Sequence, residues 1–236
     1  MLGRLKRMVF TNRVIIIGGN GALGKHMVDT FKTDWNVTNI DLAENPNANK
    51  NILLKECSFE NYSQHCKKSL SGTYEAIICV AGTWATGGIS NIEIFSQIQK
   101  LIDGSLEPAI LASHLAADHL NDSGLLVFTG AFRPFKNTYP ENLAFTLMKN
   151  ATHSLALNMA VRDKISPLAT VTTILPDILD TRVNREAMPG ENRANWIDPG
   201  KVAELVKSWA NGKNMPTNGS FAELKMMNGK LIPEFI

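Results

Sequence analysis

The segment "RVIIIGGNGALG", residues 13–24, joins a run of β-branched residues to a cluster of glycines. An uninterrupted run of Val and Ile is typical of a strand that is covered on both faces, as in a parallel sheet. Gly18, Gly21 and Gly24 follow this run, where a helix is expected to begin. In a dinucleotide-binding turn, such glycines permit the tight turn, let the backbone approach a pyrophosphate and let the helix pack on the strand. A glycine cluster can also form a plain tight loop, but its place in the first strand-to-helix turn favours a nucleotide site.

Further apolar runs follow along the chain, with segments of helical character between them. The predicted strands are 13–19, 36–42, 75–82, 124–130 and 170–176, and the predicted helices are 22–33, 58–70, 91–120, 142–163 and 199–210. Strand alternating with helix predicts an α/β fold, a single Rossmann-like doubly wound parallel sheet with helices on both faces. The length of 236 residues suits one dinucleotide-binding reductase domain at 13–236, after a basic lead-in at 1–12.

The composition is that of an ordinary globular protein. Hydrophobic residues make up 44% of the chain, charged residues 19%, and the formal net charge of +2 gives no electrostatic case for binding nucleic acid. No apolar run approaches the roughly 18 residues of a membrane span, so no transmembrane segment is expected. Cys57, Cys66 and Cys79 are irregularly spaced, which fits a reducing compartment. The histidines show no convincing ligand spacing, so no metal site is expected.

The first residues are basic and contain no acid; Arg4, Lys6, Arg7 and Arg13 fall within them. This segment has some character of an organelle-targeting signal, and it also suits a solvated lead-in to the first strand. We therefore expect a cytoplasmic protein, with a mitochondrial location as the alternative.

Asp41 ends the second predicted strand, about 20 residues after the glycines, where dinucleotide-binding folds place an acidic residue. A carboxylate there accepts hydrogen bonds from the adenine ribose hydroxyls and repels a 2′-phosphate. No basic residue follows until Lys50. The pattern favours NADH (NAD) over NADPH; the alternative is that Asp41 only caps a turn.

Several segments together resemble the short-chain dehydrogenase/reductase superfamily and, within it, the quinonoid dihydropteridine reductases. They are "GGNGALG" (18–24), "CVAGTWATGG" (79–88), "SHLAADHL" (113–120), "MKNATHSLA" (148–156) and "LPDILDTRVNREAMPG" (175–190). The tryptophan of the second segment, combined with the last segment, is more specific than the glycines. The resemblance runs from about residue 13 to the C-terminus, and it implies a pterin substrate and a homodimer formed through helices 91–120 and 142–163.

The resemblance also implies roles for single residues. Trp84 would lie beside the substrate, where its flat ring suits a pterin, although it could instead be a core aromatic. Asn184 and Arg185 match the segment that covers the substrate, and Lys149 would bond the nicotinamide ribose. The cofactor-binding residues implied are Gly18, Asn20, Gly21, Ala22, Leu23, Gly24, Asp41, Ala81, Gly82, Lys149, Pro176 and Thr181.

The catalytic helix departs from the superfamily's pattern. Phe145 stands four residues before Lys149, where the superfamily has the tyrosine that donates a proton. Ala131 stands in place of the usual catalytic serine, which the pteridine reductases also lack, and Ser105 in place of the helix asparagine. Tyr139 could substitute as the acid, but it precedes Pro140 and is expected in an extended surface loop.

Two functions therefore remain open. The first is NADH-dependent reduction of quinonoid dihydropteridine to a tetrahydropteridine such as tetrahydrobiopterin, by hydride transfer with weakened or substituted acid catalysis. The second is a lapsed reductase fold that serves as a nucleotide-binding structural or regulatory subunit, for example of a mitochondrial assembly. The chain keeps its cofactor residues, which a lapsed enzyme would be expected to lose, so we favour the reductase.

Overall fold

Eight strands form one sheet in the order β3-β2-β1-β4-β5-β6-β7-β8. The computed structural model describes residues 12–55, 57–137, 139–161 and 164–236, so the predicted lead-in lies almost entirely outside the described residues. The strands are β1 (Arg13–Ile17), β2 (Asn36–Asp41), β3 (Lys50–Leu53), β4 (Tyr74–Cys79), β5 (Leu120–Thr129), β6 (Thr170–Pro176), β7 (Phe221–Met227) and β8 (Lys230–Phe235). Neighbouring strands are parallel except β7 and β8.

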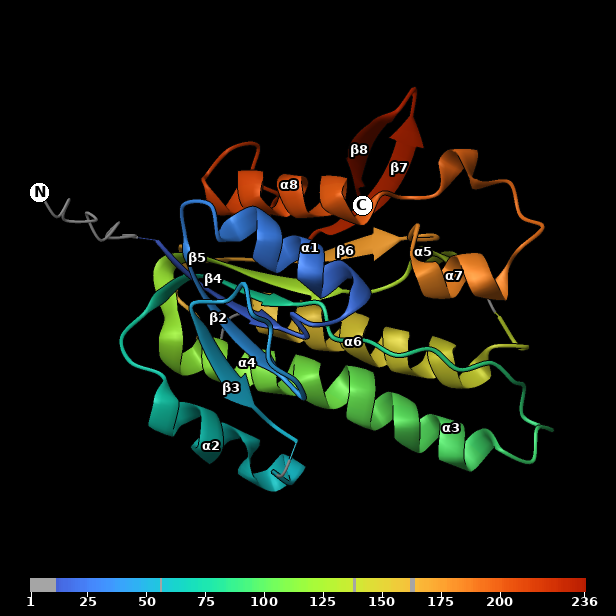
Figure 1. Cartoon of the computed structure of the whole chain (residues 1–236), viewed down its shortest axis with the longest axis horizontal. Coiled ribbons are helices and arrows are strands. Elements are labelled where there is room, and N and C mark those ends of the chain that lie inside the picture. Colours follow the sequence, from blue (N-terminus) through green and yellow to red (C-terminus); the bar gives the residue numbers. More distant parts are fainter. Residues whose placement is uncertain (1–11, 56, 138, 162–163) are drawn as a thin grey trace, which may run out of the picture.

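Helices cover both faces of the sheet, as the sequence predicts (Figure 1). The helices are α1 (Ala22–Phe31), α2 (Tyr62–Ser69), α3 (Ile94–Leu101), α4 (Glu107–His119), α5 (Phe132–Lys136), α6 (Leu143–Val161), α7 (Arg182–Ala187) and α8 (Pro199–Ala210). In Figure 1, α1 and α8 lie above the sheet, and α2, α3, α4 and α6 lie below it. Along β1, Ile16 belongs to the core with α1 and α8, whereas Ile15 and Ile17 belong to the core with α4 and α6. Burial on both faces explains the uninterrupted apolar run.

The long helix predicted at 91–120 differs in the structure. Helix α3 starts only at Ile94, and a π-helical turn at Ile102–Leu106 separates it from α4. A Cβ on Gly104, within that turn, would lie 2.8 Å from the Thr83 side chain. The widened turn therefore brings the helix close to the segment that follows β4, and π turns are frequent at functional sites.

The sequence prediction missed the C-terminal hairpin, which makes the sheet mixed rather than wholly parallel. Strands β7 and β8 pair antiparallel around Asn228 and Gly229, which both have positive φ angles, 50° and 74°. Asn-Gly is a strong sequence signal for a tight hairpin turn. Strand β3 and the short helices α5 and α7 were also not predicted.

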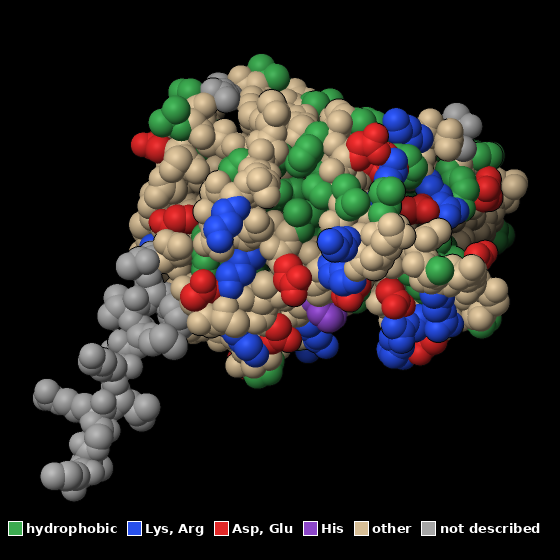
Figure 2. Space-filling model, turned by 90° about the horizontal axis from the view of Figure 1, so that it is seen from above, with side chains coloured by type: hydrophobic (Ala, Val, Ile, Leu, Met, Phe, Trp, Pro, Cys, Tyr) green, Lys and Arg blue, Asp and Glu red, His purple; other side chains and the backbone are tan. Residues whose placement is uncertain are grey.

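The surface that carries α1 and α8 mixes basic and acidic side chains, with no patch of one sign (Figure 2). Among the described residues, no helix is long and apolar enough to cross a membrane. The same part of the chain contains no group of three His, Cys, Asp or Glu side chains that could hold a metal ion.

Candidate active site

The glycine turn lies between the end of β1 and the start of α1. Gly18 has a φ of +85°, and a Cβ there would lie 2.5 Å from the backbone of Ala81. A Cβ on Gly24 would lie 1.9 Å from the carbonyl oxygen of Gly18. Gly21 caps α1, which has no acidic residue in its first turn. The helix therefore presents its N-terminal N–H groups and positive dipole end to the turn, an arrangement that suits an anionic ligand.

Asp41 lies over this turn. One carboxylate oxygen accepts a hydrogen bond from the backbone N–H of Asn20 (2.7 Å), and the other accepts from the N–H of Leu42 (2.6 Å). The carboxylate thus ties the end of β2 to the glycine turn and also caps its own turn. Its oxygens keep further lone pairs for a ligand hydroxyl.

Three asparagines, which the sequence analysis did not single out, support the turn from behind. The Asn45 amide donates to the carbonyl of Gly19 (2.7 Å), and the Asn39 amide donates to Asn51 (2.8 Å). Asn39 and Asn45 are buried. The asparagine-rich stretch from 45 to 51 was the available signal, but only the fold shows that it holds the glycine turn.

Lys149 lies at the carboxyl ends of the central strands. It is 6% exposed, and its Nζ donates to the carbonyl of Thr129 at the end of β5 (2.9 Å). Gly82 lies beside it, since a Cβ on that residue would be 3.8 Å from Nζ. Burial lowers the pKa of the Lys149 ammonium to about 8. The structure thus brings together Lys149 and the predicted cofactor floor after β4.

Phe145 lies one turn before Lys149 on α6, and its ring centroid is 5.7 Å from the Lys149 Nζ. The ring packs on a small apolar cluster that includes Ala85, Ile94 and Leu101. This cluster joins α6, α3 and the loop after β4. The phenyl ring therefore lies beside the ammonium but offers no proton.

The two other departures from the superfamily's pattern have structural roles. Ala131 donates its backbone N–H to Nε2 of His153 (3.2 Å). Burial, with Lys149 nearby, lowers the pKa of His153 to about 4, so this imidazole is a neutral acceptor. Ser105 is buried in the π-helical turn, and its hydroxyl accepts from the N–H of Thr83 (3.1 Å). His153 is a further residue that the sequence analysis did not identify.

Tyr139 lies in the loop between α5 and α6, as predicted from Pro140. Its hydroxyl lies beside the Arg133 guanidinium, which forms an ion pair with Asp177 (2.6 Å). None of the described contacts joins Tyr139 to Lys149.

Trp84 is not a core aromatic, because 51% of its surface is exposed. It lines an open cavity of about 480 Å³ between the loop after β4 and one face of α3. The remaining lining residues are Ala85, Thr86, Glu93, Ser96, Gln97 and Lys100. The cavity therefore combines one flat aromatic ring with several polar side chains.

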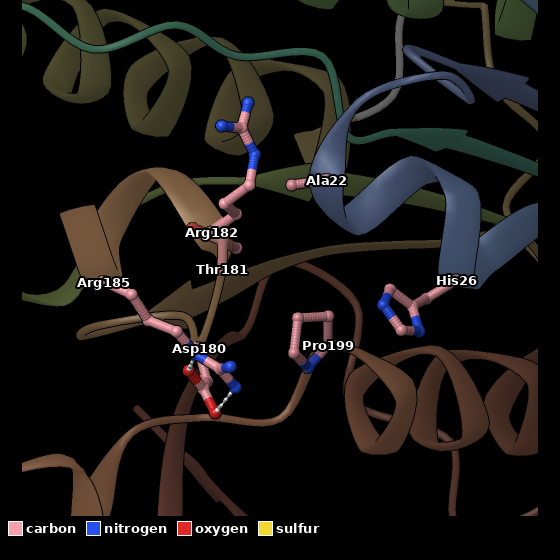
Figure 3. A pocket seen from close by; sticks show the side chains of 7 residues that line it. All are labelled: Ala22, His26, Asp180, Thr181, Arg182, Arg185 and Pro199. Atoms are coloured by element: carbon pink, nitrogen blue, oxygen red, sulfur yellow. Dashed lines mark hydrogen bonds and ion pairs between the residues drawn. The ribbon is translucent and has the colours of Figure 1, made fainter.

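A second cavity, of about 330 Å³, separates α1 from α7 and the start of α8 (Figure 3). It is lined by Ala22, His26, Asp180, Thr181, Arg182, Arg185 and Pro199. The Arg185 guanidinium binds both oxygens of Asp180, at 2.5 and 2.7 Å. Thr181 accepts the N–H of Asn184 (3.2 Å), whose amide donates to Leu179 (2.8 Å). The predicted substrate residue Asn184 therefore anchors its own loop, which starts just after Pro176 ends β6.

Comparison with known proteins gives related sequences and many structures of the same fold. No family model matches the chain. Dihydropteridine reductase from Dictyostelium discoideum is 33% identical over 220 residues, which cover 91% of this chain and 95% of that protein. A short chain dehydrogenase family protein from Francisella tularensis has a TM-score of 0.74 and 21% identity, covering 90% of this chain and 96% of its own. BdcA in complex with NADPH has a TM-score of 0.74 and 19% identity, covering 90% and 92%.

Proposed function

This chain belongs to the dihydropteridine reductases of the short-chain dehydrogenase/reductase superfamily, and from that premise we propose that it reduces quinonoid dihydropteridine to tetrahydropteridine with NADH. The observation that carries the proposal is the buried Lys149 ammonium, which lies at the end of β5 and beside Gly82, just after β4. A buried ammonium without a carboxylate partner is costly unless a ligand uses it. Phenylalanine in place of tyrosine at position 145 removes a proton donor but does not prevent hydride transfer. A quinonoid ring is already electron-poor and accepts hydride readily.

The residues present fit a nicotinamide dinucleotide. A side chain at Gly18 or Gly24 would collide with the backbone of Ala81 or of Gly18, so only glycines allow this tight turn, whose backbone N–H groups would form the cradle for the pyrophosphate. Asp41 would bind the adenine ribose, and Lys149 the nicotinamide ribose. The cofactor supplies the hydride. The residues of this chain would position the cofactor and hold the proton that the product gains.

We predict that NADH binds more tightly than NADPH, because the negative charge of the Asp41 carboxylate would repel a 2′-phosphate on the adenine ribose. Asp41→Ala should weaken NADH binding by about tenfold, the value of one charge-assisted hydrogen bond. It should also reduce the preference for NADH. Fluorescence titration of both cofactors measures this.

Glu44→Ala is the matched control, since Glu44 is an exposed acid on the same loop and its loss makes the same change in net charge. It should leave both affinities unchanged. Equal or tighter NADPH binding by the natural sequence would contradict the prediction, as would unchanged discrimination in Asp41→Ala.

We predict that Trp84 stacks on the pterin. Trp84→Ala should raise the KM for quinonoid dihydropterin by about tenfold or more, since stacking on an aromatic side chain contributes about 1–3 kcal/mol. NADH affinity should not change. Trp84→Phe keeps an aromatic ring, so its KM for quinonoid dihydropterin should lie between those of the natural sequence and Trp84→Ala. An unchanged KM in Trp84→Ala would place the pterin elsewhere.

The alternative, a lapsed nucleotide-binding subunit, is favoured by the phenyl ring at position 145 and by the basic residues of the N-terminal segment. NADH oxidation with freshly generated quinonoid dihydropterin separates the two functions. Turnover supports the reductase. If the protein binds NADH but shows no turnover, the result would support the structural or regulatory subunit. Such a subunit would belong to a larger assembly, either in the cytoplasm or in mitochondria.

A homodimer is also part of the proposal. The family resemblance implies that two copies pair through α3, α4 and α6, and large apolar side chains are exposed on these helices. They include, with their exposed fractions, Phe95 (82%), Ile110 (39%), Leu147 (45%), Leu157 (47%) and Val161 (83%). Exposed apolar surface of this kind is typical of interfaces. Sedimentation equilibrium measures the oligomeric state.

A further inference from the structure

Lys149 has more hydrogen-bonding capacity than its described neighbours use. An ammonium carries three N–H donors. Within the described part of the chain, Nζ makes one hydrogen bond, to the carbonyl of Thr129 (2.9 Å). Its other close neighbours include Gly82, which has no side chain, and the Phe145 ring, which accepts no conventional hydrogen bond. Two N–H donors therefore remain for a ligand or water.

The other proton-bearing groups around Lys149 are committed or do not release a proton near neutral pH. The Thr129 hydroxyl donates to the carbonyl of Cys79 (3.0 Å). Burial raises the pKa of the Cys79 thiol to about 12, so it stays neutral. His153 is already neutral, since burial and Lys149 lower its pKa to about 4. Among these groups, only the Lys149 ammonium can give up a proton in the physiological range.

The environment also makes this ammonium a better acid than an exposed lysine. No described carboxylate contacts it, and burial disfavours its charged form, which lowers its pKa to about 8. A proton donor is most efficient when its pKa lies near the working pH. With tyrosine at position 145, the ammonium would assist the hydroxyl. With phenylalanine there, position 145 offers no hydroxyl that could pass a proton from Lys149 to the substrate.

We propose that Lys149 is the proton donor of this reductase and delivers its proton, through one water beside the Phe145 ring, to the pterin nitrogen that gains electron density as hydride arrives. This inference rests on the proposed function. One N–H bond of the ammonium breaks and one N–H bond forms on the pterin, while the hydride comes from NADH. The neutral amine then takes a proton from solvent, so atoms and charges balance over the cycle.

The donor role fixes the sign of the pH dependence. Lys149 must be protonated to react, so turnover is full below a pH of about 8 and falls about tenfold per pH unit above it. The groups that face Lys149 are Cys79 on β4, the Thr129 carbonyl on β5, and Phe145 and His153 on α6. None of these changes its charge near pH 8, so the decline belongs to Lys149.

The first test needs no substrate. In protein labelled with ¹³C at lysine Cε, the signal that disappears in Lys149→Met is assigned to Lys149, and its chemical shift is followed with pH. We expect it to titrate near pH 8, well before the exposed lysines, which serve as the internal reference. Titration together with the exposed lysines would overturn the proposal.

The second test compares the pH dependence of kcat in the natural sequence and in Lys149→Arg. The guanidinium keeps the charge and the hydrogen-bonding capacity but does not release its proton. We expect kcat to fall by about 10²-fold or more, the contribution of a positioned acid, and to become independent of pH. NADH affinity, measured by fluorescence, should change only a few-fold.

Unchanged kcat in Lys149→Arg, or a natural-sequence profile that stays flat through pH 8, would overturn the donor role while leaving the reductase intact. Lack of any turnover in protein that binds NADH would overturn the proposed function, and the donor role with it. The NMR titration of Lys149 stands in either case, so the two failures are distinguishable.

Discussion

Phe145→Tyr should raise the turnover of quinonoid dihydropterin by roughly 10²-fold. A positioned acid contributes about 10²–10⁴-fold, and we expect the low end of this range because Lys149 already supplies a proton. The Phe145 ring lies 5.7 Å from the Lys149 Nζ, so an added hydroxyl would lie near an ammonium that lowers its pKa. The side-chain volume hardly changes, and the fold and NADH affinity should survive. Steady-state kcat at neutral pH is the measurement. A weak carbonyl reductase activity should also appear.

Phe235→Tyr is the matched control. Phe235 is 44% exposed on β8, at the edge of the sheet and away from Lys149, so the same added hydroxyl there should leave kcat unchanged. Equal activity of Phe145→Tyr and the natural sequence would mean that proton delivery does not limit turnover. If both proteins bind NADH and neither turns over the pterin, the lapsed subunit becomes the better reading.

The central strands of the sheet could be predicted from the sequence, whereas its edges could not. β1 is buried on both faces, and its apolar run is visible without knowledge of its partners. β3 has one buried residue among four, and β8 has none among six. Such strands are defined by pairing with a neighbour, so their own residues carry little periodic signal.

The candidate site divides in the same way. Residue type and spacing predicted the glycine turn and Asp41, and the resemblance implied Lys149, because each of these predictions depends on the residue type at a particular position. Lys149 donates a hydrogen bond to the Thr129 carbonyl, and His153 accepts one from the Ala131 N–H. Both partners are backbone groups, which residue type does not reveal. Only the fold reveals such partners. Asn184 stays a predicted substrate contact, and the structure adds that its side-chain amide donates to the Leu179 carbonyl within its own loop.

Gly24→Ala should abolish tight NADH binding, because α1 can hold its position over β1 only without a side chain there. A Cβ would lie 1.9 Å from the Gly18 carbonyl oxygen and 2.7 Å from the Gly19 Cα, both of them backbone atoms that cannot rotate away. The N-terminus of α1 must then shift from the turn. Losing two charge-assisted hydrogen bonds to the pyrophosphate, at about 1.5 kcal/mol each, weakens binding by roughly 10²-fold.

The sign of the stability change decides whether this packing argument is right. In an unobstructed helix, Gly→Ala stabilises by about 1 kcal/mol, so without the overlap Gly24→Ala would raise the Tm. With the overlap, overpacking costs about 1–3 kcal/mol and outweighs that gain, so the Tm should fall. Gly190→Ala is the control, since nothing lies within 4 Å of its Cβ position, and it should change neither Tm nor NADH affinity. Thermal unfolding with and without NADH measures both, and a raised Tm in Gly24→Ala would contradict the close helix-to-strand contact on which the cofactor cradle depends.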